Sequence, residues 1–302
     1  MSVHLPIATD APRCAEFARS IELDPGGTAL APDVIVVAEV AEPWPKPVAK
    51  HPDLVELVAA CVARSEQVRL LAAVPRDSGP RRVVAFRPAV GGALRAESEI
   101  HDDPRDALAS ALDVDAVDTV SIVDGRRTML ICTQGSHDVC CGTEGAEFAD
   151  EMSRQQPDVE LFRVSHTGGH RFAPTAMTLP DGRMWANLTP AIASRILERD
   201  LDPVLAASHC RGWWGAPTGP SQIAERAVFA QLGWSVDEVE RSVDVTEAET
   251  GYDVTVTTDL MRWQVRIELG REVPTIKCES PGGLPVKPSR EWVVAQGPVR
   301  LP

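Results

Sequence analysis

Two histidines, His166 and His170, lie four residues apart in the stretch VSHTGGHRF at residues 164–172. On a helix this spacing would place both imidazoles on one face. Two consecutive glycines separate them, and each glycine costs about 1 kcal/mol in a helix interior. Glycine also permits positive φ and a close approach of the backbone to another group. The stretch therefore predicts a tight loop that brings two imidazoles together to bind something.

Cysteines gather in a second stretch, CTQGSHDVCCGTEG at residues 132–145. Cys132 ends an apolar strand, and Cys140 and Cys141 come just before the next helix. A thioredoxin-like fold carries its chemistry at this strand-to-helix turn, where the helix N-terminus favours thiolate. The loop with the histidine pair lies beside that turn in such a fold. We therefore expect two cysteines and two histidines to converge.

Two cysteines and two histidines are compatible with three kinds of site. They could hold a tetrahedral zinc ion, they could hold a [2Fe–2S] cluster with cysteine on one iron and histidine on the other, or the cysteines could form a bare redox pair. The C-x₈-C spacing of Cys132 and Cys141 is longer than the roughly two to four residues of a zinc knuckle. A thioredoxin-type redox pair would need C-x-x-C, which the sequence lacks. The spacing favours the larger object, a cluster.

The elements that must position these residues follow one order twice: strand, helix, strand, hairpin, helix. In the first half we expect them at residues 33–40, 51–65, 68–74, 81–88 with 93–100, and 103–113. In the second half we expect them at 127–132, 145–156, 159–164, 175–188 and 189–201, with Thr189 as N-cap of the last helix. This order is thioredoxin-like.

The predicted fold class is α/β, with two thioredoxin-like units in tandem and a small C-terminal α+β segment. The units span residues 1–118, without cluster ligands, and 119–219, with them. Residues 220–302 read as a helix followed by a small antiparallel sheet at 252–258 and 262–269.

Composition excludes several classes of partner. With 302 residues, 44% of them hydrophobic and 25% charged, the chain reads as globular and soluble, with room for two domains. Its net charge of −14 argues against nucleic acid or an anionic membrane as partner. We find neither a signal peptide nor an apolar run of about 18 residues, so we expect a cytoplasmic protein. There, thiols stay reduced, and clustered cysteines serve as ligands or redox groups.

The motifs CTQGSHDVCCG, SHTGGHRFA and LPDG resemble those of the sucrase/ferredoxin-like family, thioredoxin-like ferredoxins with two histidine ligands. GGTAL and VIVVAEVAEPWP are similar to the N-terminal half of that family, and the resemblance covers roughly residues 14–200. The family pattern, C-x₈-C followed by H-x₃-H, falls on Cys132, Cys141, His166 and His170. Family members often have histidine at the position of Gln134, which is not a ligand.

The resemblance implies a [2Fe–2S] cluster with Cys132 and Cys141 on the inner iron and with His166 and His170 on the outer, more exposed iron. It implies an electron carrier whose donor and acceptor are unknown redox proteins, and sucrase activity is not expected. The alternative is a zinc-stabilised binding module without a redox role. A thiol reductase, which would use Cys140 and Cys141 as a redox pair, comes third.

Several residues near the motifs receive structural interpretations. Cys140 is read as a buried neighbour of Cys141 and His137 as a solvated loop histidine, whereas Arg171 is equally a surface residue or a docking residue. Four further cysteines lie outside the motifs. Cys61 is assigned to the core, Cys14 has no partner in view, Cys278 is assigned a structural role, and Cys210 lies in a stretch, His209–Trp214, that is assigned to packing.

Overall fold

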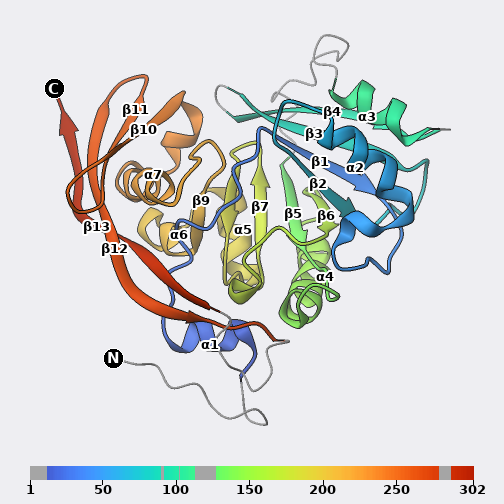
Figure 1. The fold of residues 1–302 in the computed structure, drawn as a ribbon, viewed down its shortest axis with the longest axis horizontal. Helices are drawn as coiled ribbons and strands as arrows, with labels where there is room; N and C mark the ends of the chain where they lie inside the picture. Colours follow the sequence, from blue (N-terminus) through green and yellow to red (C-terminus); the bar gives the residue numbers. More distant parts are fainter. Residues whose placement is uncertain (1–11, 90–91, 102, 113–126, 279–286) are drawn as a thin grey trace.

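The computed structural model describes residues 12–89, 92–101, 103–112, 127–278 and 287–302. The chain forms a mixed α/β fold with one nine-stranded sheet and a separate four-stranded antiparallel sheet (Figure 1). The α/β class predicted from the sequence is confirmed. None of the helices within the described ranges is long and apolar enough to cross a bilayer.

The N-terminal half follows the predicted order of strand, helix, strand, hairpin and helix. Its elements are β1 (Val34–Glu39), α2 (Val55–Val62), β2 (Val68–Ala73), β3 (Arg82–Ala89), β4 (Gly92–Glu99) and α3 (Pro104–Leu112). β1 is buried along its whole length, as expected of an inner strand with a parallel neighbour. Its residues alternate between two cores, with Val36 packed among residues of α2 and α3 and Val37 on the other face.

The second half repeats the same order. Its elements are β5 (Thr128–Cys132), α4 (Ala146–Gln155), β6 (Glu160–Val164), β7 (Ala176–Leu179), β8 (Arg183–Trp185) and α5 (Pro190–Glu198). The Thr189 side chain accepts a hydrogen bond from the backbone N–H of Ile192, which confirms the predicted N-cap of α5. The hairpin between β7 and β8 turns at residues 180–182, where Gly182 has a φ of 71°.

The two halves meet edge to edge within one sheet. The strand order is β4-β3-β1-β2-β6-β5-β7-β8-β9, so each half contributes the same four-strand pattern. β2 and β6 join them as antiparallel neighbours, with Ala73 opposite Val164. One core draws residues from both halves, among them Leu71 and Leu130. The predicted boundary at 118/119 lies outside the described residues and stays a prediction.

Among the α-helices and β-strands of the described residues, five had no counterpart in the sequence analysis. They are α1 (Cys14–Ser20), α6 (Pro203–His209), β9 (Cys210–Trp213), β10 (Arg241–Glu247) and β13 (Lys287–Leu301). The two helices have seven residues each, too few for a clear apolar periodicity. β10 is mostly exposed, and its apolar alternation consists of only two residues, Val243 and Val245, which is too short to predict a strand.

The C-terminal segment contains the predicted helix and antiparallel sheet. α7 (Gly219–Leu232) is followed by β10, β11 (Tyr252–Thr258), β12 (Arg262–Thr275) and β13. Figure 1 shows this curved sheet around α7, with the far end of β12 reaching α1. Val254 and Val265 on the inner side of the sheet pack in one core with Val228 of α7. The segment thus brings the C-terminal part of the chain next to the first helix.

A buried group of four charges ties the C-terminal segment to the nine-stranded sheet. Arg183 of β8 pairs with Glu225 of α7 at 2.8 Å and with Asp237 at 2.7 Å. Arg241 at the start of β10 pairs with the same two carboxylates at 3.0 and 2.9 Å. All four side chains are at most 3% exposed. Two positive and two negative charges balance, so removal of one leaves an uncompensated buried charge.

Replacement of Glu225 by alanine is expected to lower the free energy of unfolding by about 3 kcal/mol or more, the usual cost of breaking a buried ion pair. The matched control is Glu238→Ala, because Glu238 pairs with Arg199 at 3.1 Å but is 67% exposed. That substitution should cost less than about 1 kcal/mol. Urea unfolding followed by tryptophan fluorescence measures both, and equal losses would contradict the role given to the buried charges.

Candidate functional site

Parallel pairing of β5 and β6 puts the cysteine stretch and the histidine loop at one edge of the sheet. Cys132 is the last residue of β5 and lies opposite Val164, the last residue of β6. The carboxyl ends of parallel strands meet at the same edge, which is where open α/β sheets bind their ligands. The loop from residue 165 onward therefore begins beside Cys132. This geometry is the physical reason that the two motifs converge.

Cys132, Cys141 and His166 form the centre of the site. Their ligand atoms all lie within 4.8 Å of one another, and Cys132 Sγ is 3.8 Å from His166 Nδ1. Both cysteines are 1% exposed, whereas His166 is partly exposed. Three of the four residues predicted as ligands are thus brought together, with the sulfurs inside and an imidazole toward the surface.

Cys141 reaches Cys132 because glycines let the backbones approach. Cys141 begins a π-helical turn, Cys141–Gly145, that leads into α4. A Cβ on Gly145 would lie 2.2 Å from the carbonyl oxygen of Cys132. A Cβ on Gly142 would lie 2.4 Å from Cα of Gly135. No side chain fits at either position without moving the turn away from the end of β5.

The pKa values of the two inner cysteines are shifted in opposite directions. The hydrogen bond from Cys141 holds the pKa of Cys132 well below its ordinary value, and His166 and the backbone N–H of Thr167 act in the same direction. That hydrogen bond and burial raise the pKa of Cys141. The interaction between the two side chains thus favours ionisation at Cys132 over ionisation at Cys141. Two cysteine sulfurs and an imidazole in one place suit a soft or borderline metal.

The histidine loop has the backbone that its two glycines predict. Gly168 and Gly169 have φ values of 81° and 75°, in the region that side chains disfavour. Beneath them lies the buried Arg211, whose Nη1 donates to the carbonyl oxygen of Gly168 at 3.1 Å. A Cβ on Gly169 would meet the guanidinium of Arg211 at 2.7 Å. Nothing in the sequence links Arg211 to this loop, and only the fold reveals its role.

Gln134 holds the start of the same loop. Its Oε1 accepts a hydrogen bond from the backbone N–H of His166 at 3.0 Å, and its Nε2 donates to the carbonyl oxygen of Pro45 at 2.8 Å. Gln134 is 2% exposed. Gln134 thus positions a predicted ligand and joins it to the N-terminal half.

His170, the fourth predicted ligand, lies next to the other three but outside their close group. Its ring centroid is 5.9 Å from that of His166. Its Nδ1 lies 3.1 Å from Asp138 Oδ2 and 3.2 Å from Cys14 Sγ. Burial alone would raise the pKa of Asp138, but the contact with His170 lowers it. Asp138 lies within the cysteine stretch at residues 132–145, where no local pattern distinguishes it from an ordinary loop residue.

His137 is not the solvated loop histidine that the sequence suggested. Its ring stacks on that of His166, with centroids 3.5 Å apart and planes inclined by 13°. Burial, together with the charges of His166 and Lys46, lowers the pKa of His137 to about 4. It is a neutral neighbour that restricts how the ring of His166 can turn.

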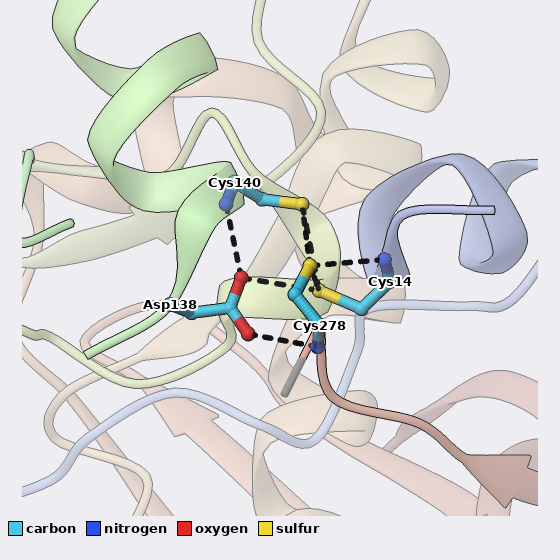
Figure 2. Close-up of side chains that lie close together, drawn as sticks. All are labelled: Cys14, Asp138, Cys140 and Cys278. Carbon is cyan, nitrogen blue, oxygen red and sulfur yellow. Dashed lines mark hydrogen bonds between the residues drawn. The ribbon is translucent and has the colours of Figure 1, made fainter. Parts of the chain in front are cut away.

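The adjacent cysteines Cys140 and Cys141 face different groups. Cys141 joins Cys132 and His166, whereas Cys140 lies in a second group with Cys14, Cys278 and Asp138 (Figure 2). Cys14 therefore does have partners, contrary to the sequence reading.

The other residues near the motifs also have definite surroundings. Cys61 is buried in the N-terminal core, as predicted, and Cys210 in the core of the second half. Arg171 is partly buried and donates to Thr275 Oγ1 at 3.1 Å. It is therefore not a plain surface arginine.

Comparison with known proteins gives one result. The model of the sucrase/ferredoxin-like family matches residues 25–212, more than half of the 302-residue chain. The match contains all four predicted ligands and ends just before β9 does. The chain matches no curated protein and no solved structure. On the strength of the family match, this chain belongs to the sucrase/ferredoxin-like family.

Proposed function

We propose that the protein is an electron carrier that holds a [2Fe–2S] cluster through Cys132, Cys141, His166 and His170. The observation that carries the proposal is the meeting of Cys132, Cys141 and His166 within 4.8 Å at the carboxyl edge of β5 and β6. Membership of a family whose name includes ferredoxin supports it. The cluster, when bound, supplies a site that gains and loses one electron.

The donor set suits such a cluster. Two buried thiol groups provide one pair of ligands and two partly exposed imidazoles the other. His170 is held through Nδ1 by Asp138, which leaves Nε2 as its ligand atom, in the manner of carboxylate–histidine–metal triads. Thr133 and Thr167 flank Cys132 and His166, and their buried hydroxyls have no hydrogen-bond partner in the described part of the chain. Such hydroxyls suit an inorganic sulfide as acceptor.

The chain's own residues would give the site a buried side and an accessible side. Cys132 and Cys141 are each 1% exposed, so their sulfurs would be shielded from water. His166 and His170 are partly exposed, so a redox partner protein would dock on the histidine side. His137 stacks on His166, and Asp138 contacts His170. These contacts would hold both imidazole rings in place before a redox partner protein docks. Little rearrangement would then accompany electron exchange.

A second candidate is a structural zinc site, in a binding module without redox function. It is favoured by the short distance of 3.8 Å between Cys132 Sγ and His166 Nδ1. Two ligands of one tetrahedral zinc ion stand roughly 3.6 Å apart, given bond lengths of about 2.3 Å to sulfur and 2.0 Å to nitrogen. In this case Cys132, Cys141, His166 and His170 would surround a single ion.

Protein purified without air is expected to be red-brown and to contain about two irons and two acid-labile sulfides per chain. Cys132→Ser and Cys141→Ser should each lose the iron, because each removes one of the two inner sulfurs. Iron and sulfide assays with visible absorption measure the outcome. Cys61→Ser is the control, since Cys61 is also buried but lies in the N-terminal core. A colourless protein with one zinc ion at this site would refute the electron carrier and support the zinc-stabilised binding module.

Replacement of Gly145 by alanine is expected to reduce the iron content well below that of the unchanged chain. The new methyl group would collide with the carbonyl oxygen of Cys132 and push Cys141 away from it. Gly297→Ala is the matched control, because a Cβ there meets no atom within 4 Å. Both proteins are compared by iron per chain and by circular dichroism. If Gly145→Ala keeps full iron content, the close approach of turn and strand is not needed to hold the ligands.

A further inference from the structure

Three cysteines from distant parts of the chain meet beside the site of Cys132, Cys141 and His166, called the first site below. Cys14 begins α1, Cys140 precedes the π-helical turn, and Cys278 follows β12 (Figure 2). Cys14 and Cys140 are fully buried, and Cys278 is partly exposed. All three thiols are free. The fold thus brings three thiols from separate segments of the chain to one place, where they can bind one ligand together.

The distances between the three sulfurs are those of ligands on one metal ion. Cys140 Sγ lies 3.4 Å from Cys278 Sγ, Cys14 Sγ lies 3.6 Å from Cys140 Sγ, and the remaining distance is 3.5 Å. A tetrahedral zinc ion with bonds of about 2.3 Å to sulfur sets its thiolates roughly 3.8 Å apart. The spacing therefore favours a single ion.

Asp138 completes four ligands. Its Oδ1 lies 3.4 Å from Cys14 Sγ, and its ligand atom and the three sulfurs all lie within 4.8 Å of one another. Oδ1 also accepts a hydrogen bond from the backbone N–H of Cys140 at 3.0 Å, and Oδ2 accepts one from the backbone N–H of Cys278 at 3.3 Å. The carboxylate is thus fixed by the same segments that supply the thiols, as expected of a prearranged ligand.

The surroundings offset the negative charge that such a site would carry. Three thiolates and one carboxylate around a divalent ion leave a net charge of −2. The partly buried guanidinium of Arg171 interacts electrostatically with Cys14. The backbone N–H of Cys14 lies 3.4 Å from Cys278 Sγ, in position to donate to a thiolate. Both features suit sulfurs that are ionised by a metal rather than protonated.

We propose that Cys14, Cys140, Cys278 and Asp138 bind one zinc ion, at a site separate from that of Cys132 and Cys141. Each thiol gives up its proton to solvent when its sulfur binds the metal, and no electron is transferred. The ion joins α1, the cysteine turn and the end of β12. Asp138 also contacts His170, so the zinc ion and its ligands would fix the position of His170 at the outer side of the first site. The four ligands of this zinc ion include none of the four residues that would hold the cluster.

The first test uses the full chain with Cys132→Ser and Cys141→Ser, which removes the inner sulfurs of the first site. Cobalt(II) replaces zinc as a visible probe. We expect one cobalt per chain, with tetrahedral absorption bands and charge transfer from sulfur. Adding Cys278→Ser should weaken cobalt binding by more than the roughly 10- to 100-fold that loss of an outer partner costs. Cys61→Ser in the same background should leave the cobalt affinity unchanged.

The second test needs no double substitution and separates this proposal from the electron carrier. Zinc and iron are measured in the otherwise unchanged chain after purification without air. Cys278→Ser should lose about one zinc and keep the iron, whereas Cys132→Ser should lose the iron and keep the zinc. Cys278→His should retain zinc, because imidazole is also a zinc ligand, and this variant shows that the serine loss is not misfolding.

Three results would overturn the zinc site. One is an unchanged chain without zinc that also binds no added zinc. Another is cobalt affinity that Cys14→Ser and Cys278→Ser leave unaltered. The third is iron and sulfide retained after Cys132→Ser but lost after Cys278→Ser, which would assign the cluster to the second group of cysteines. An unchanged chain that contains zinc but no iron would refute only the proposed electron carrier.

Discussion

The parallel pairing of β5 with β6 is the constraint on which the rest of the site depends. It sets Cys132 opposite Val164. The strand with the first cysteine therefore ends at the same edge at which the loop with both histidines begins. A shift of this register by one residue would turn Cys132 to the other face of the sheet. The pairing lies inside a nine-stranded sheet with cores on both faces, which protects the register from such a slip.

Close backbone approach is the second requirement, and glycine meets it on both sides of the site. Gly145 allows the cysteine turn to lie against the carbonyl of Cys132, and Gly169 allows the histidine loop to lie on Arg211. The turn and the loop then deliver their side chains from opposite directions. Adjacent Cys140 and Cys141 consequently serve two different groups, since one faces the sheet edge and the other faces α1.

The C-terminal segment extends this arrangement. The buried charges of Arg183, Glu225, Asp237 and Arg241 fix α7 and β10 to β8. From there the long strand β12 carries the chain to α1 and delivers Cys278 next to Cys14 and Cys140. Cys278 thus lies after the family match of residues 25–212, and Cys14 lies before it. Both meet Cys140, which lies within the match. The two groups of cysteines are connected by Asp138 and His170.

The sequence by itself determined the α/β class, the twofold order of strand, helix, strand, hairpin and helix, and the two stretches whose cysteines and histidine meet at the sheet edge. These follow from local patterns: apolar runs, turn residues, a capping threonine and the spacing within one loop. Tertiary structure alone decided that Gln134 and Arg211 hold the histidine loop, that Asp138 contacts His170, and that Cys14 and Cys278 meet Cys140. These contacts join residues far apart in the chain, and no local pattern records a distance across the fold.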